Sequence, residues 1–185
     1  MFTEPQQAYL GQIVRTTQVI AVALILGVAI LGAVLVFIVD LSDRAPVETP
    51  FISMFGITIG IASIFVAPQV SRMVVAGMRR TLVAGKSIRA GDSSAIPEEV
   101  GKVGELAHIY QINQIIYRAV LEGAAFMNLT IYMVEVQPMG PAIALCLLIA
   151  MFFKFPTRSH MENWINAEMT TIEQLRSFEE IGSHA

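Results

Sequence analysis

The sequence predicts an all-α, polytopic membrane protein with four transmembrane helices, cytosolic helical extensions and a C-terminal amphipathic helix. Two observations carry this prediction. Of the 185 residues, 55% are hydrophobic and only 15% are charged, whereas soluble domains average about 45–50% and about 25%. In addition, every residue from Val19 to Val39 is apolar or glycine, and about 20 such residues are enough to cross a hydrocarbon core.

Three further segments have the composition of membrane spans. The second begins at Phe51 and contains no ionisable residue before Arg72. The third is interrupted by Glu122 and Asn128, and a proline-containing turn separates it from the fourth, so that these two form a helical hairpin. The predicted spans are about 19–39, 51–70, 117–136 and 140–155, with polar connections at 40–49 and 85–96, a cytosolic helical segment at 71–116, an amphipathic tail at 157–180, and a single domain over 1–185.

The tail is too interrupted by charges to form a fifth span, and its apolar residues recur at helical spacing. Ser159 and Glu162 fit the capping-box pattern at its start. We expect a helix from Pro156 to about Phe178 that lies on the membrane or on the helix Pro97–Tyr110, with Trp164 as an interfacial anchor. The side chains expected on its buried face are Met161, Trp164, Ile165, Ile172 and Leu175.

The basic residues predict the orientation. With four spans, Arg44 lies alone on one side of the membrane, and the other eleven of the twelve Lys and Arg residues lie on the opposite side. Because basic residues accumulate on the cytoplasmic side, both termini and the long middle segment are expected in the cytoplasm. The expected location is the inner, cytoplasmic membrane of a bacterium.

A polar face leads into the third span. Gln111, Gln114, Arg118 and Glu122 are three, four and four residues apart, a spacing that places them on one side of a helix. If that helix ends near Val136, Glu122 lies ~21 Å below its outer end. In one interpretation Arg118 and Glu122 form a helix-surface pair and extend toward the headgroups. In the other, Glu122 lines a proton or ion pathway or binds a buried partner.

Two other features of the spans favour helix packing. Asn128 lies near the middle of the third span, where an asparagine typically hydrogen-bonds a neighbouring helix. Gly56 and Gly60 form a G-x-x-x-G pair in the second span, which lets a neighbouring backbone approach closely. The candidate intramembrane polar site is therefore Arg118, Glu122 and Asn128, and the candidate packing site is Gly56 and Gly60.

Composition and motifs argue against several functional classes. One cysteine and three scattered histidines offer little from which to build a metal centre, and no phosphate-binding loop, nucleophile elbow or zinc-protease motif occurs. A net charge of −3 does not favour nucleic-acid binding. We therefore expect no cofactor, no metal, no nucleic-acid partner and no enzymatic activity.

The segment from Tyr117 to Tyr132 reads YRAVLEGAAFMNLTIY. Its R-x-x-L-E-G-A-A pattern resembles a stretch found in small multi-pass membrane proteins of bacteria, and this resemblance implies a membrane protein without implying an activity. A weaker local similarity is to the proteolipid subunits of rotary ATPases, in which an intramembrane glutamate carries the ion. That similarity would make Glu122 an ion site, but Arg118 one turn away and the long charged middle segment depart from the pattern.

Two functions follow as expectations. The first is a non-catalytic membrane scaffold or accessory subunit, whose partners are membrane lipid and either further copies of the chain or other membrane subunits. The alternative is an ion- or proton-coupled transport component that uses Glu122, with Arg118 as its counter-charge and Asn128 as a polar lining residue. The transport function requires a water-filled path to Glu122, whereas the scaffold requires a partner protein.

Overall fold

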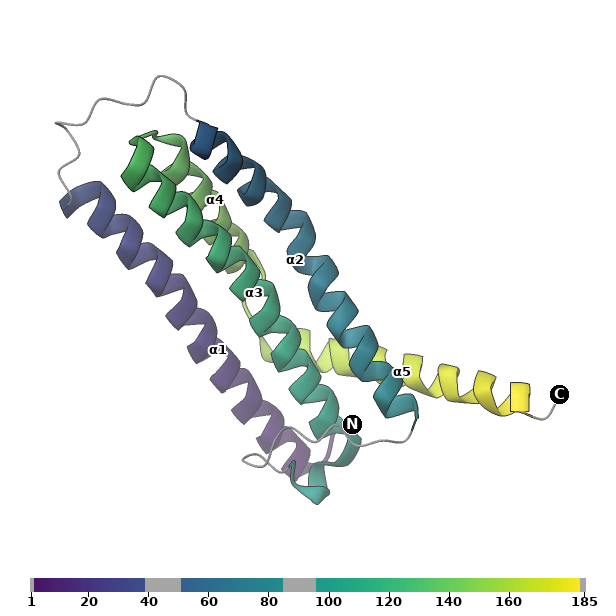
Figure 1. Cartoon of the computed structure of the whole chain (residues 1–185). Coiled ribbons are helices and arrows are strands. Elements are labelled where there is room, and N and C mark those ends of the chain that lie inside the picture. Colours follow the sequence, from purple (N-terminus) through teal and green to yellow (C-terminus); the bar gives the residue numbers. More distant parts are fainter. Residues whose placement is uncertain (1, 39–50, 85–95, 184–185) are drawn as a thin grey trace. The chain divides into compact units, whose positions relative to one another are not determined.

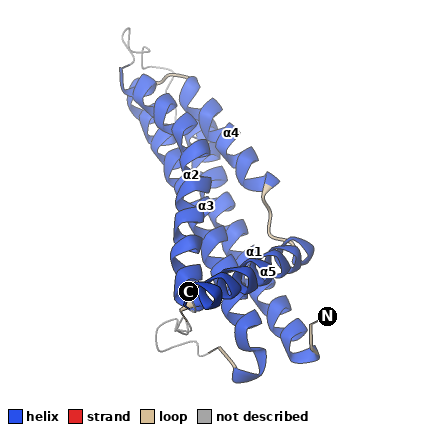
Figure 2. Ribbon diagram, turned by 90° about the vertical axis from the view of Figure 1, so that its right-hand side faces the viewer, coloured by secondary structure: helices blue, strands red, loops and turns tan. Residues whose placement is uncertain are grey.

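The computed structural model describes residues 2–38, 51–84 and 96–183, and every regular element within these ranges is a helix (Figures 1 and 2). The all-helical class is therefore confirmed for the described part of the chain. The elements are α1 (Glu4–Ala33), continued by the π-helix η1 (Val34–Ile38), α2 (Phe51–Val83), the 3₁₀-helix η2 (Glu98–Val100), α3 (Gly101–Glu135), α4 (Met139–Phe153) and α5 (Arg158–Ser183). The predicted connections at 40–49 and 85–96 lie, except for Ile96, outside the described residues.

The chain divides into two compact units. An apolar unit consists of Val19–Val70 and Ile115–Phe155, and a charged unit consists of Met1–Gln18, Ser71–Gln114 and Pro156–Ala185. These boundaries fall within two residues of one end of each predicted span, at 19, 70, 117 and 155. The hydropathy of the sequence and the contacts of the folded chain therefore divide it at nearly the same residues.

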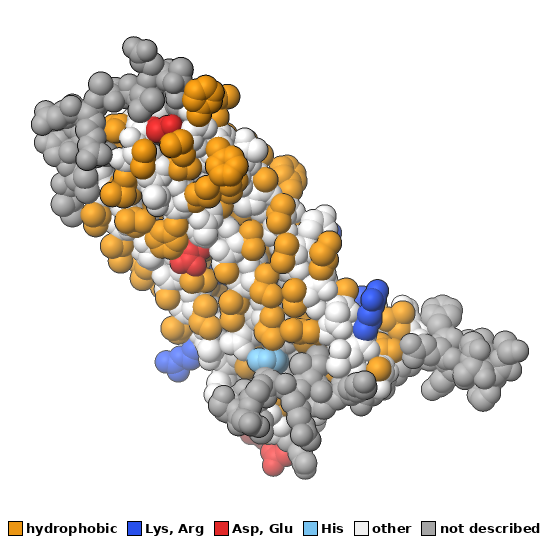
Figure 3. All heavy atoms as spheres, in the orientation of Figure 1, with side chains coloured by type: hydrophobic (Ala, Val, Ile, Leu, Met, Phe, Trp, Pro, Cys, Tyr) orange, Lys and Arg blue, Asp and Glu red, His pale blue; other side chains and the backbone are white. Residues whose placement is uncertain are grey.

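In the apolar unit, α3 packs against α1, α2 and α4. Glu122 and Leu129 lie beside glycines of α1, and Asn128 lies beside glycines of both α2 and α4. Large exposed hydrophobic residues also concentrate in this unit, because Met73 and Leu175 are the only ones among the described residues that lie outside it. Figure 3 shows apolar side chains along the visible helix surfaces. So much exposed apolar surface is typical of a protein in contact with lipid.

The charged unit has its own hydrophobic core. Leu10 and Val14 of α1 pack with side chains of α2, α3 and α5. On α5, the predicted face residues Met161, Ile165 and Ile172 are buried, whereas Leu175 is 40% exposed. The prediction that Leu175 is buried is therefore wrong, and among the described side chains Ile172 is the last residue of α5 that belongs to this core.

Among the described residues, two helical segments are long and apolar enough to cross a membrane: the first is α1 together with η1, and the second is α2. A third candidate arises if α4 and α5 are counted together as one broken span. The predicted third span belongs to the 35-residue helix α3, which carries Arg118 and Glu122. The predicted fourth span is α4, which has 15 residues, fewer than the ~20 of a typical span. The structure thus supports two or three candidate spans by length and composition.

Candidate functional site

Asn128 joins the central helix to α2. Its side-chain amide donates hydrogen bonds to the carbonyl oxygens of Gly56 on α2, at 3.0 Å, and of Ala124 on its own helix, at 2.9 Å. The residue is 1% exposed. An amide buried among apolar side chains needs such partners, because an unsatisfied polar group costs about 1–3 kcal/mol.

Three glycines make room for this contact. A β-carbon at Gly56 would lie 2.6 Å from Cδ1 of Ile131 and 3.0 Å from Oδ1 of Asn128, and one at Gly60 would collide with Ile143. A β-carbon at Gly140 on α4 would lie 2.6 Å from the backbone oxygen of Asn128. The predicted packing pair Gly56 and Gly60 thus faces the hairpin of α3 and α4. Gly140, which lies next to the turn between those two helices, is a third glycine at a close helix contact.

Glu135, the last residue of α3, holds the beginning of α2. Its two carboxylate oxygens accept hydrogen bonds from the backbone N–H groups of Ile52, at 3.0 Å, and Ser53, at 2.7 Å. The residue is 3% exposed. The first N–H groups of a helix have no partner within the helix and lie at the positive end of its dipole, so a carboxylate is suited to this place.

Arg118 binds the carboxyl end of α4, as Glu135 binds the amino end of α2. One of its terminal nitrogens donates a hydrogen bond of 2.5 Å to the carbonyl oxygen of Lys154, the C-cap residue of α4. Arg118 is 1% exposed, and the ammonium group of Lys154 lies 4.2 Å from the centre of the Tyr117 ring. A cation stabilises a helix C-terminus because the last carbonyl groups carry partial negative charge.

Glu122 does not form the expected ion pair with Arg118: ion pairs within the described residues join Arg79 to Glu168 and Arg158 to Glu162. Glu122 is instead half-buried against α1, where a β-carbon at Gly27 would lie 3.7 Å from its Oε1 atom. The structure shows no hydrogen-bond partner for it within the described ranges. The three candidate polar residues therefore lie in three separate surroundings, so they do not form one site.

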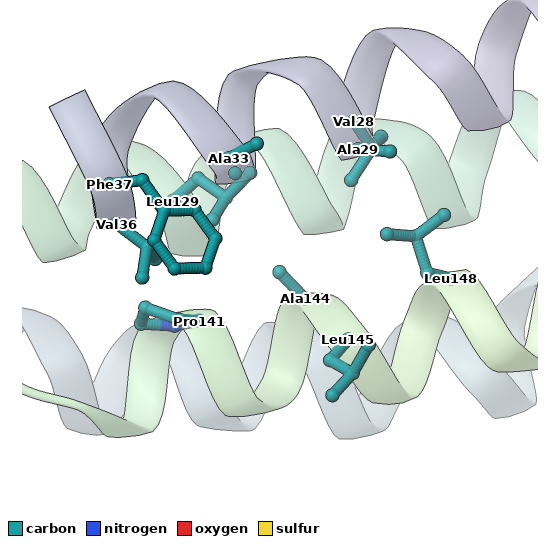
Figure 4. A pocket seen from close by; sticks show the side chains of 11 residues that line it. Val28, Ala29, Ala33, Val36, Phe37, Leu129, Pro141, Ala144, Leu145 and Leu148 are labelled. Carbon is teal, nitrogen blue, oxygen red and sulfur yellow. The ribbon is translucent and has the colours of Figure 1, made fainter.

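Two apolar grooves lie between helices of the apolar unit. The first, of about 440 Å³, runs between α1 and α4, with Leu129 at its base and Phe37 and Pro141 near one end (Figure 4). The second, of about 340 Å³, lies between α2 and α3 and includes Ala119 and Gly123. Neither groove includes Glu122, and Ser63 is the one polar side chain that lines either of them.

In the charged unit, Trp164 is half-buried and contacts Tyr110 of α3, with the ring centres 5.6 Å apart. The tail therefore contacts the helix that contains Tyr110, which is one of its two expected resting places. A bidentate pair reinforces this contact, because Arg79 of α2 binds Glu168 of α5 through Nε at 2.8 Å and Nη2 at 2.6 Å. At the start of α5 the cap is Thr157, which accepts the N–H of His160, and Glu162 binds Arg158 rather than closing a capping box.

Within the described residues, no group of three or more His, Cys, Asp or Glu side chains is arranged to hold a metal ion. Comparison with protein-family models, curated proteins and solved structures finds no match to this chain. The functional argument therefore depends on the geometry of the chain alone.

Three important residues had no signal in the sequence that identified their role. Glu135 and Gly140 lie at the two ends of a short turn, where an acid and a glycine are common for other reasons. Lys154 follows the last apolar residue of α4 and resembles a simple interfacial lysine. Their roles depend on contacts between helices, which the spacing of residues along one helix does not reveal.

Proposed function

We propose that this protein is a non-catalytic integral membrane scaffold or accessory subunit of a larger membrane assembly. Its four spans would lie in a bacterial inner membrane, with both termini and the charged unit in the cytoplasm. Support for membrane insertion comes from the exposed hydrophobic residues of the apolar unit and from the agreement between its boundaries and the predicted ends of the spans.

The observation that carries the scaffold proposal is that buried polar side chains hydrogen-bond the backbone of neighbouring helices. The side chains of Arg118, Asn128 and Glu135 all end on backbone groups of α2, α3 or α4. Polar residues inside a membrane protein often mark a pathway for a substrate or ion. Here these three stabilise helix ends and helix contacts, and the two grooves described between α1 and α4 and between α2 and α3 are lined mainly by apolar side chains. Such surfaces suit packing against other hydrophobic groups.

Photo-crosslinking in intact cells tests the scaffold. A benzophenone amino acid at Ala119 or Gly123, both exposed beside the α2–α3 groove, should yield a small number of adducts of defined mass. Asn163 and Thr170 are matched controls, because they are exposed on the charged unit and should give a different adduct pattern. A protein that forms no adduct at either groove position, and that migrates as a monomer in mild detergent, would contradict the proposal.

Glu122 favours a second candidate, an ion- or proton-coupled transport component. It is a half-buried acid of the apolar unit for which the described ranges offer no hydrogen-bond partner. Transport requires that this carboxyl group bind and release an ion. Reconstituted protein would then conduct protons or sodium ions across vesicle membranes, and Glu122→Gln would abolish the flux while the fold is preserved. Equal flux in the two proteins would exclude this role.

A further inference from the structure

Two arginines of the charged unit lie beside the inner ends of the predicted spans. Arg15 on α1 precedes Val19 by four residues, and Arg72 on α2 follows Val70 by two residues. At 1.5 Å per residue they lie ~6 Å and ~3 Å from the span ends along their helices. Both side chains are exposed, and neither makes a hydrogen bond or ion pair with any residue that the structure describes.

No acidic residue of the same helix can neutralise these charges. On a helix, the neighbours of a side chain are three and four residues away. For both arginines these positions hold only apolar residues, glycine, proline and glutamine, namely Gly11, Gln12, Gln18 and Val19 around Arg15, and Pro68, Gln69, Val75 and Ala76 around Arg72. Each arginine thus presents, close to the predicted membrane surface, a guanidinium group that no described acidic residue neutralises.

We propose that Arg15 and Arg72 bind the phosphate headgroups of anionic phospholipids at the inner surface of the membrane. This inference depends on the proposed membrane insertion and adds a preference for one class of lipid. The charges are complementary, and a guanidinium group can donate two parallel hydrogen bonds to a phosphate. Basic residues next to a membrane attract anionic lipids, and the attraction decreases within a Debye length of about 8 Å.

Two other exposed cations provide matched controls. Arg80 lies ten residues beyond Val70 on α2 and Lys102 lies twelve residues before Gln114 on α3, which corresponds to ~15 Å and ~18 Å along the helices. Both distances exceed the Debye length of about 8 Å. Lys102 also has Glu99 and Glu105 three residues away on either side. Removal of these charges should leave lipid preference unchanged.

Native mass spectrometry of the full-length protein measures this preference. The protein is mixed in mild detergent with equal amounts of phosphatidylglycerol and phosphatidylcholine that carry the same acyl chains, and the bound lipids are counted. We expect phosphatidylglycerol to dominate. Arg15→Gln and Arg72→Gln should each lower the ratio of bound lipids about fivefold, which corresponds to about 1 kcal/mol per basic residue. The variants Arg15→Lys and Arg72→Lys should keep most of the preference, because they retain the charge.

The inference is overturned if the wild-type protein shows no preference, or if Arg80→Gln with Lys102→Gln lowers the ratio as much as the two test variants do. High salt should also abolish the lipid preference of the wild-type protein, because salt screens the charges. This measurement does not depend on a variant that could misfold. Failure of the proposed membrane insertion gives a different result, since the protein would then not incorporate into phosphatidylcholine vesicles at all.

Discussion

The carboxylate of Glu135 accepts a hydrogen bond from the backbone N–H of Ser53 at a distance of 2.7 Å. It therefore supplies negative charge to the first turn of α2, while Arg118, on the same helix as Glu135, supplies positive charge to the last carbonyl groups of α4. In hydrocarbon, free N–H and C=O groups at helix ends cannot be hydrated, and leaving them unsatisfied is costly. The central helix α3 thus stabilises the beginning of α2 and the end of α4, two of the three helices that it packs against.

Removal of the Glu135 charge should loosen the start of α2. Hydrogen bonds to a charged group contribute about 1.5–3 kcal/mol, so we expect Glu135→Ala to lower the free energy of unfolding by about that amount. Glu173→Ala is the control, because Glu173 is exposed on α5. Thermal unfolding in detergent measures both variants. A Glu135→Ala variant as stable as the control would show that the α2 terminus does not need its cap.

Arg118 and Glu122 should act independently. Arg118→Gln should destabilise the protein by about 1.5–3 kcal/mol, because the end of α4 loses a charged donor. A double-mutant cycle with Glu122→Gln should give a coupling energy close to zero, since the two side chains have different surroundings. A coupling of about 0.5 kcal/mol or more would instead support the helix-surface pair that the spacing of the sequence suggested.

Asn128 should contribute through its contact with α2. Interhelical hydrogen bonds in membranes are worth about 0.6 kcal/mol on average and at most about 1.7 kcal/mol, and we expect Asn128→Ala to lose an amount in this range. Thr130→Ala is the matched control two residues away, because the exposed Thr130 hydroxyl donates only to Phe126 of its own helix. Thermal unfolding should separate the two variants, and equal effects would argue against Asn128 as an interhelical contact.

Gly140 and Gly123 should respond in opposite ways to alanine. Gly140→Ala forces a methyl group against the backbone oxygen of Asn128, and overpacking of this kind typically costs about 1–3 kcal/mol. A β-carbon at Gly123 meets nothing within 4 Å, so Gly123→Ala should be neutral or should stabilise helix α3 by up to about 1 kcal/mol. If Gly140→Ala unfolds at the wild-type temperature, α4 does not approach α3 as closely as described.

Trp164 is the only tryptophan in the chain, so its fluorescence reports on the packing of α5. Because it is half-buried against Tyr110, we expect blue-shifted emission in the intact protein and a shift to longer wavelength in Tyr110→Ala. Tyr132→Ala is a control in the apolar unit that should leave the emission unchanged. Emission like that of indole in water in the wild-type protein would contradict the docking of α5.

The sequence alone was sufficient to predict the helical class and the buried face of the C-terminal helix up to Ile172. The predicted span ends at 19, 70, 117 and 155 lie within two residues of the boundaries between the two compact units, a division that the sequence did not predict. These features depend on hydrophobic periodicity and on runs without charge, which are properties of one segment at a time. The same property explains the error at Leu175, because helical spacing shows which side of α5 is apolar but does not show which of those apolar residues meet a partner helix.

The partners of the polar residues could not be predicted in the same way. The spacing of four residues made Glu122 the natural partner of Arg118, whereas the actual acceptor is the carbonyl of Lys154, 36 residues away. A backbone carbonyl has no signature in the sequence, and helix ends become available as acceptors only after the helices have packed. For the same reason the role of Glu135 required the structure.

Cysteine labelling at residue 139 tests whether this chain crosses the membrane four times. Met139 is exposed at the start of α4, and Met139→Cys can be studied with the native Cys146 replaced by alanine. Four spans place residue 139 outside the cytoplasm, so a membrane-impermeant maleimide should label it in spheroplasts. Ser159→Cys, at the start of α5, should react only after the membrane is permeabilised. With two spans, or with α4 and α5 as one broken third span, residue 139 would be cytoplasmic, and a failure to label it before permeabilisation would exclude four spans.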